Sequence, residues 1–321
     1  MITGLAGPRM CHLSMMDDAF DDQYIGCANK MEKKAGKLLK TEMSPFSQMW
    51  EKATEKWNNV KTKLSPPKGF KDEYGIAIVA YTDSTTLYNG KAFPTIFNVA
   101  VRTAGISQAH YTTTFQFKAF HYYLTIALQL LRKSAGGCDV MYNTTVYRGV
   151  PESYKDWNSE IRFGHFASSS IEKEVAERFR TKKVIGRGTL FTIQTCFGVK
   201  IWNYSYNPLD KEVLIPVHEK FSVTQRQGNN ITLRSTNQTC SRFNCAYLGG
   251  EYWAEQEKYL GGVKFTDTHS SLSLTMCVLP GLLMSCINSD RELALTVESS
   301  VQISVKTSVK GAARSIKETK C

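Results

Sequence analysis

Residues 114–150 read TFQFKAFHYYLTIALQLLRKSAGGCDVMYNTTVYRGV, and the spacing of the apolar residues changes inside this stretch. In its first half, apolar side chains recur at intervals of three and four, at Phe117, Phe120, Leu124, Leu128 and Leu131. This pattern predicts a core helix over about residues 114–133 that ends at the glycine pair 136–137. Its uncharged run is too short to span a bilayer. Beyond the glycines, residues 145–150 are typical of a short strand.

The segments before this stretch also have helical patterns, and those after it have strand patterns. Residues 22–63 are rich in Met, Glu, Lys, Ala and Trp with helical periodicity, and Pro45 after Ser44 predicts the start of a second amphipathic helix there. The later part of the chain holds strand candidates at 189–195, 199–205 and 212–216, and a hairpin over 221–234 that turns at Gly228-Asn229. We therefore expect an α+β fold, in which a helical N-terminal half packs on a strand-rich core.

The composition is that of a globular protein. The chain has 321 residues, of which 42% are hydrophobic and 21% charged, and this excludes wholesale disorder, collagen and a coiled coil. The 40 Lys plus Arg against 29 Asp plus Glu give a net charge of +11, which suits anionic partners. Because no helix-turn-helix, zinc-finger or paired-aromatic RNA-binding signature is present, we expect a solvated basic surface and no nucleic acid partner.

The cysteines and sequons favour an oxidising compartment. The nine cysteines lie far apart, and neither they nor the six histidines have metal-ligand spacing, so we expect no metal and several disulfides. Four glycosylation sequons start at Asn143, Asn203, Asn230 and Asn237. Residues 1–8 have no signal-peptide pattern, and we expect the start of the chain to be missing or misassigned.

An uncharged run lies near the end of the chain. Between Asp267 and Asp290 there are 22 residues without formal charge, interrupted by Pro280 and Gly281. A buried helix-turn-helix and a C-terminal lipid-anchor signal are the two interpretations. The anchor is doubtful, because 34 residues follow Ile287 and such a signal should end the chain.

Common catalytic motifs are absent. The sequence has no Gly-x-Ser-x-Gly elbow, P-loop or dinucleotide glycine fingerprint, which excludes ordinary hydrolases and Rossmann enzymes. Taken alone, Ser168-Ser169-Ser170 before Glu172 and Glu174 is typical of a helix N-cap.

Three elements in order change this interpretation: VYRG at 146–149, RFGHFASSS at 162–170 and DKEVLIP at 210–216. The chain resembles the arginine-specific ecto-ADP-ribosyltransferases of vertebrates, whose signature is an Arg, a Ser and a Glu on separate strands. Three further segments share the resemblance, at 21–27, 117–125 and 244–248. The resemblance implies a mono-ADP-ribosyltransferase domain over residues 21–265. It leaves an uncertain segment over 1–20 and an apolar segment with a basic, irregular tail over 266–321.

The implied substrate is NAD, which loses nicotinamide as ADP-ribose passes to a protein arginine. Glu212 is the expected catalytic carboxylate, holding the ribose 2′-hydroxyl and stabilising the oxocarbenium-like transition state. Arg148 is expected to bind a phosphate or the neighbouring ribose, and Ser168 to position the nicotinamide-side ribose. Without the resemblance, Glu212 would be a surface strand residue and Arg148 part of a strand-edge salt bridge.

Two further residues are candidates for nicotinamide binding. Gly164 would let the backbone approach the nicotinamide amide, and Phe179 would supply a stacking face. The alternative for Phe179 is a core position in the helix after Ser170.

Asp210 departs from the arginine-modifying pattern, which has Glu at the position that engages the acceptor guanidinium. The shorter side chain withdraws the carboxylate by roughly 1.5 Å, and misplacement of about 1 Å can cost about 100-fold in rate. An NAD glycohydrolase with water as acceptor is therefore one alternative. A catalytically silent secreted binding domain is another.

Family order also implies two disulfides, Cys27–Cys245 and Cys138–Cys196. Cys11, Cys240, Cys277, Cys286 and Cys321 have no assigned partners. The implied location is extracellular, either secreted or at the cell surface.

Overall fold

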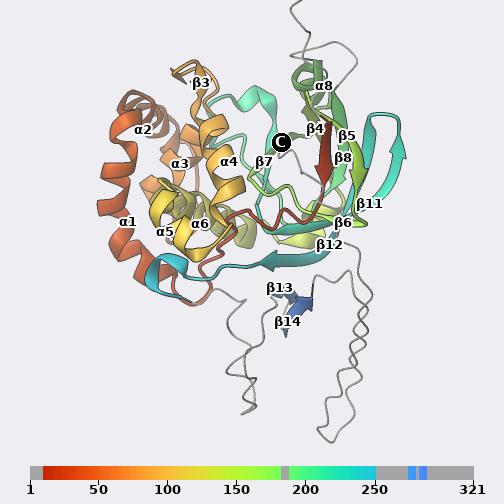
Figure 1. Cartoon of the computed structure of the whole chain (residues 1–321). Helices are drawn as coiled ribbons and strands as arrows, with labels where there is room; N and C mark the ends of the chain where they lie inside the picture. Colours follow the sequence, from red (N-terminus) through yellow and green to blue (C-terminus); the bar gives the residue numbers. More distant parts are fainter. Residues whose placement is uncertain (1–9, 182–187, 251–273, 280–281, 288–321) are drawn as a thin grey trace, which may run out of the picture.

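The computed structural model describes residues 10–181, 188–250, 274–279 and 282–287. Helices α1 to α6 gather on one side of the molecule, and the main sheet lies on the other side with α8 packed on it (Figure 1), which confirms the α+β expectation. The expected segment over 1–20 is described only from Met10 onward, and the basic tail after Ile287 lies outside the described residues.

The helical half contains seven of the described helices and a two-strand hairpin. The helices are α1 Ala28–Met43, η1 Ser44–Phe46, α2 Ser47–Lys61, α3 Asp72–Thr82, α4 Phe93–Ala104, α5 Gln108–Thr114 and α6 Lys118–Ser134, and the hairpin pairs β2 Leu87–Tyr88 with β3 Lys91–Ala92. The two amphipathic helices expected between residues 22 and 63 are confirmed as α1 and α2. None of the described helices is both long and apolar enough to cross a membrane.

The strand half contains two short α-helices and two 3-10 turns in addition to its strands. Its elements, with the N-terminal strand first, are β1 Met10–Leu13, α7 Cys138–Tyr142, β4 Thr145–Val150, β5 Ser153–Trp157, β6 Glu160–Ile161, β7 Ala167–Ser170, α8 Lys173–Thr181, β8 Thr189–Gln194, β9 Val199–Lys200, η2 Pro208–Asp210, β10 Glu212–Ile215, β11 Glu219–Gln227, β12 Asn230–Ser241, η3 Ala246–Leu248, β13 Leu274–Leu279 and β14 Leu282–Ile287. The main sheet has the order β14-β13-β12-β8-β4-β7-β10-β9, and β11 pairs with β12 and β6. The expected hairpin with its turn at Gly228-Asn229 is confirmed as β11–β12.

Three expected elements differ from the structure. The core helix begins at Lys118 rather than near 114, because the Glu42 carboxylate of α1 accepts the backbone N–H groups of Ala119 and Phe120 and so caps α6 there. The strand expected over 199–205 ends at Lys200, and a turn follows in which Tyr204 N donates to Ile201 O. The helix-turn-helix, one of the two interpretations of the uncharged run after Asp267, is wrong. The described residues there form β13 and β14, which pair antiparallel.

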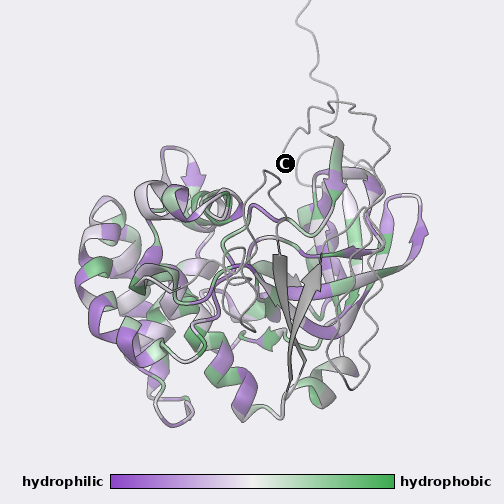
Figure 2. Cartoon of the chain, turned by 60° about the horizontal axis from the view of Figure 1, so that its bottom comes forward, coloured by the Kyte–Doolittle hydropathy of each residue, from purple (hydrophilic) through white to green (hydrophobic). Residues whose placement is uncertain are grey.

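An aromatic core joins the helical half to the sheet. Phe97 of α4 packs edge to face against Phe120 of α6, with ring centroids 4.8 Å apart, and stacks at 5.7 Å on Phe166, which leads into β7. The Tyr81 hydroxyl of α3 donates to the Phe166 carbonyl at 2.6 Å. Hydrophilic and hydrophobic residues alternate along the outer helices (Figure 2), as expected where one face of each helix packs on this core. The start of β7 is therefore held by the helices.

Two disulfides join segments that are distant in the sequence, and the first of them links the helical half to the strand half. Cys27 bonds Cys245, and Cys138 bonds Cys196, as the family order implied. Cys11 is also disulfide-bonded. Cys240 is a buried free thiol.

A fully buried ion pair connects three distant segments. The Arg162 guanidinium donates to Asp21 Oδ2 at 2.5 Å and to the Cys240 carbonyl at 2.6 Å, and neither side chain of the pair is exposed. Asp21 Oδ1 in turn accepts the backbone N–H groups of Arg242 and Phe243. The pair thus fixes the N-terminal segment and the end of β12 against the loop that enters β7.

We expect Arg162→Met to lower the free energy of unfolding by about 3–5 kcal/mol, because it leaves the Asp21 carboxylate buried without a counter-charge. Chemical denaturation measures the difference. The double variant Asp21→Asn/Arg162→Met is the control and should recover part of the loss. A loss below about 1 kcal/mol in the single variant, the range of exposed pairs, would show that the pair is not a structural constraint.

Candidate functional site

Three neighbouring strands bring the expected Arg, Ser and Glu together. Arg148 lies on β4, Ser168 on β7 and Glu212 on β10, and these strands are adjacent in the sheet. β4 pairs with β7 only at Tyr147–Ser170, so the two strands separate beside Arg148. The Arg148 guanidinium bridges this gap by donating to the Ser168 carbonyl at 2.7 Å. The opening between β4 and β7 is where the three side chains converge.

Arg148 is held by a neutral histidine that the sequence analysis did not single out. Because the Phe163 carbonyl can only accept, His165 Nδ1 donates to it at 2.6 Å, which leaves Nε2 to accept from Arg148 Nη2 at 3.0 Å. Burial holds the pKa of His165 well below its usual range, and the nearby Arg102 and Arg148 lower it further. The neutral ring is therefore an acceptor that aims the guanidinium. The only sequence signal for it was its place inside the 162–170 motif.

Arg148 itself is partly desolvated. Burial lowers the pKa of its guanidinium from the usual value, with Tyr81 acting in the opposite direction. Its Nε is buried and has no hydrogen-bond partner among the described residues. The side chain therefore keeps one charged donor that no described protein group satisfies.

Glu212 is the first residue of β10, directly after the tight turn of η2. Lys211 adopts the left-handed conformation, with φ 44°, which ends η2 and starts the strand at Glu212. Burial raises the pKa of the Glu212 carboxyl to about 7, while a hydrogen bond from Ser168 lowers it and Asp210 raises it. The residue is partly exposed as a whole, yet its Oε1 is buried without a partner in the described part of the chain.

These two unpaired atoms fit a polar substrate. A buried donor or acceptor without a partner destabilises a protein by about 1–3 kcal/mol, so such atoms are retained where a ligand completes them. Arg148 Nε offers a hydrogen bond to an anion or sugar oxygen, and Glu212 Oε1 accepts one from a hydroxyl. A carboxylate in this position also stabilises positive charge that develops beside it.

Asp210 lies at the outer edge of the same site. Its backbone carbonyl accepts from the Ser170 hydroxyl at 2.7 Å, which ties η2 to β7. Its carboxylate contacts a guanidinium of the same chain, because Arg178 Nη2 of α8 lies 3.4 Å from Asp210 Oδ1. Both side chains are exposed enough for a second molecule to compete for the contact.

The structure places the two nicotinamide candidates differently. Gly164 has φ +66°, and a Cβ there would lie 2.6 Å from the Met16 Cβ, so packing alone requires a glycine. Phe179 is 44% exposed, and the core position considered for it is wrong. It directly follows Arg178, the α8 residue whose guanidinium contacts Asp210.

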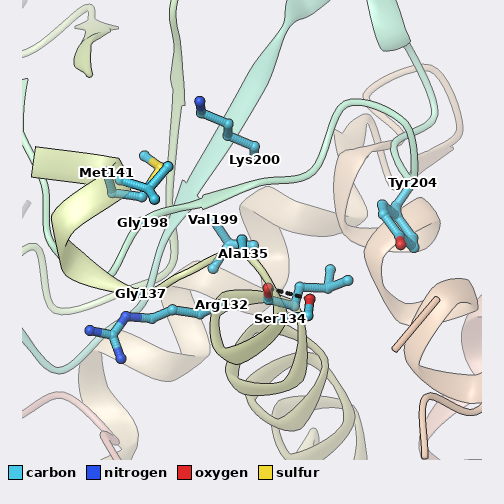
Figure 3. A pocket seen from close by; sticks show the side chains of 11 residues that line it. Arg132, Ser134, Ala135, Gly137, Met141, Gly198, Val199, Lys200 and Tyr204 are labelled. Atoms are coloured by element: carbon cyan, nitrogen blue, oxygen red, sulfur yellow. Dashed lines mark hydrogen bonds between the residues drawn. The ribbon is translucent and has the colours of Figure 1, made fainter. Parts of the chain in front are cut away.

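A separate depression lies away from these residues. Its cavity volume is about 190 Å³, and it lies between the end of α6, α7 and β9, where Arg132, Ser134, Lys200 and Tyr204 line it (Figure 3). None of Arg148, Ser168 and Glu212 lines it. Among the described residues, no group of His, Cys, Asp and Glu has the arrangement of a metal site.

Comparisons with known proteins agree with this geometry. A family model described as NAD:arginine ADP-ribosyltransferase matches residues 13–241. The chain is 47% identical to ecto-ADP-ribosyltransferase 5 of Rattus norvegicus over 250 residues, which cover 74% of this chain and 77% of the relative. It is 40% identical to T-cell ecto-ADP-ribosyltransferase 2 of the same species over 291 residues, 89% of this chain and 92% of the relative.

Solved structures share the fold. The crystal structure of the eucaryotic mono-ADP-ribosyltransferase ART2.2 has a TM-score of 0.62 and 40% identity, and covers 74% of this chain and 99% of its own. Two ART2.2 mutants, solved in complex with NADH and with NAD, match with the same TM-score and 39% identity.

The raised pKa of Glu212 predicts that this residue destabilises the protein at neutral pH. Between the unfolded value near 4.3 and the folded value of about 7, the folded state binds more protons, so stability falls as pH rises through this window. We expect Glu212→Gln to be more stable than wild type by about 1–2 kcal/mol at pH 8, with the gain disappearing near pH 4.5. Urea denaturation at several pH values measures this. The exposed Glu174→Gln is the control, and a gain that does not vary with pH would contradict the shift.

Proposed function

The chain belongs to the NAD:arginine ADP-ribosyltransferase family, and on this premise we propose that it is an extracellular mono-ADP-ribosyltransferase. It binds NAD as substrate, releases nicotinamide and transfers ADP-ribose to arginine side chains of proteins. The observation that carries the proposal is the unpaired, buried Oε1 of Glu212 beside Arg148 and Ser168. The NAD and NADH complexes of ART2.2 support the choice of substrate.

Each residue has a separate task in this proposal. Glu212 Oε1 accepts a hydrogen bond from the ribose 2′-hydroxyl, and the carboxylate stabilises the positive charge that develops on the ribose as the bond to nicotinamide breaks. Arg148, aimed by His165, binds a phosphate or the neighbouring ribose. Ser168 holds the Glu212 carboxylate and the ribose on the same side of the opening.

The transfer step completes the reaction. A guanidinium nitrogen of the acceptor bonds to the ribose carbon that neutral nicotinamide leaves, and that nitrogen releases one proton to the solvent. Asp210, at the outer edge of the site, is the carboxylate that positions the acceptor. Its contact with Arg178 supports this role, because it shows that a guanidinium can approach this carboxylate.

The extracellular location rests on several independent features. The relatives are named ecto-enzymes, and the structure contains disulfides between distant segments. The asparagines of all four sequons, Asn143, Asn203, Asn230 and Asn237, are exposed. Buried asparagines could not accept a glycan.

An NAD glycohydrolase is the second candidate. Asp210 has the shorter side chain, and Arg178 already occupies part of its hydrogen-bonding capacity. Both effects weaken the hold on an acceptor arginine and leave the Glu212 carboxylate in place, so water would compete more effectively for the ribose.

We expect Glu212→Gln to reduce nicotinamide release by at least about 100-fold, because the amide keeps the shape but loses the charge that stabilises the transition state. Labelled NAD and the oxidised protein are incubated, and free and protein-bound label are separated. NAD affinity and folding should change little, and Glu174→Gln should behave as wild type. Turnover within a few-fold of wild type would remove Glu212 from the mechanism, and no turnover in wild type would favour a silent binding domain.

Asp210→Glu should raise the ratio of ADP-ribosylated arginine analogue to free ADP-ribose by several-fold, with little change in total NAD consumption. The residue contacts the acceptor and not the breaking bond, so it alters partitioning after cleavage. Asp210→Asn, which has the same length without charge, is the matched control and should shift the products toward free ADP-ribose. Equal partitioning in all three proteins would show that Asp210 does not position the acceptor.

A further inference from the structure

The outward face of α1 carries five exposed lysines. They are Lys30, Lys33, Lys34, Lys37 and Lys40, and together they form what we term the α1 lysine face. None of the five forms an ion pair with a described residue, whereas Lys61 and Lys71 elsewhere in the helical half do. The net charge of +11 is thus partly concentrated on one helix.

Helical geometry places these lysines on one face of α1. At about 100° per residue, the five side chains span an arc of roughly 120°, opposite the buried Met31, Ala35, Leu39 and Met43. From Lys30 to Lys40 the α1 lysine face is about 15 Å long. A compact patch of positive charge results, roughly as wide as it is long.

This arrangement opposes helix stability. Lysines three and four residues apart repel one another, and a lysine in the first turn opposes the helix dipole, where α1 has no acidic residue. The two acidic residues of α1 do not compensate. Glu32 accepts from Lys71, Tyr74 and Tyr122, and Glu42 caps α6. A bound polyanion would remove this repulsion.

We propose that the α1 lysine face binds sulfated polysaccharide chains. Such chains carry closely spaced negative charges, and several of these can contact five lysines that lie together on one helix face. α1 exposes no large apolar side chain, and a helix that inserts into a bilayer surface needs one. The choice of this polyanion rests on the extracellular location in the proposed function.

The face lies away from the candidate active site. α1 packs on α6, η1 and η3 at the outer edge of the helical half, and the strands that carry Arg148, Ser168 and Glu212 lie on the other side of α6 (Figure 1). Binding therefore leaves the site open, and it would concentrate the protein where such chains are abundant.

The test compares two triple variants of equal charge change in the full-length oxidised protein. Lys33→Gln/Lys34→Gln/Lys37→Gln removes the centre of the face, and glutamine preserves helix propensity. Lys91→Gln/Lys133→Gln/Lys173→Gln removes three exposed lysines from three other elements. Affinity for heparin is measured over a range of NaCl concentrations. We expect at least about a 10-fold loss for the α1 variant against less than about 3-fold for the control, with a shallower salt dependence for the α1 variant.

Other outcomes overturn the proposal. Equal losses in the two variants would assign binding to net charge alone. Unchanged affinity for desulfated heparin would exclude sulfate recognition, and binding of the α1 face to phosphatidylserine vesicles but not to heparin would assign it to a membrane surface. NAD consumption should be the same in all three proteins. If none consumes NAD while heparin still discriminates between them, the proposed function fails and the polysaccharide site stands.

Discussion

The buried ion pair of Asp21 and Arg162 is the constraint on which the rest of the structure depends. Two charges removed from water must stay together, and here each also satisfies backbone groups of a third segment. From Arg162 the chain passes through His165 to Ser168. This ion pair therefore sets the position of β7, and with it one side of the candidate site. Its carboxylate and its guanidinium come from residues 141 positions apart in the sequence.

The site itself is electrostatically unfavourable in the free protein. Burial shifts the pKa of both Arg148 and Glu212 toward their uncharged forms, and each side chain keeps a buried atom without a partner in the described residues. The aromatic core around Phe97 and Phe166 and the Cys27–Cys245 disulfide hold the structure that surrounds the site. A rigid surrounding structure is what allows such groups to remain charged and correctly placed.

Local patterns in the sequence predicted local structure well. The 3.6-residue periodicity around Leu124 predicted α6, and Gly228-Asn229 predicted the β11–β12 turn, because both signals act within a few residues. The convergence of Arg148, Ser168 and Glu212 was predictable only through the family resemblance. His165 was missed because its role depends on a tautomer fixed by a carbonyl two residues away. The strand expected over 199–205 was predicted too long, because a turn at Ile201 ends β9 at Lys200 within an otherwise strand-like composition.

The Cys27–Cys245 bond has a consequence for how the molecule responds to proteases. It joins residues 218 positions apart, so the helical half and most of the strand half form one covalent ring. A single cleavage of the backbone anywhere inside that ring leaves every fragment attached, and both halves of the site remain in one molecule. On a denaturing gel without reductant, nicked protein would therefore keep the mass of the intact chain, and a reductant would separate its fragments. The resistance of the protein to proteolysis thus depends on the redox state of its surroundings.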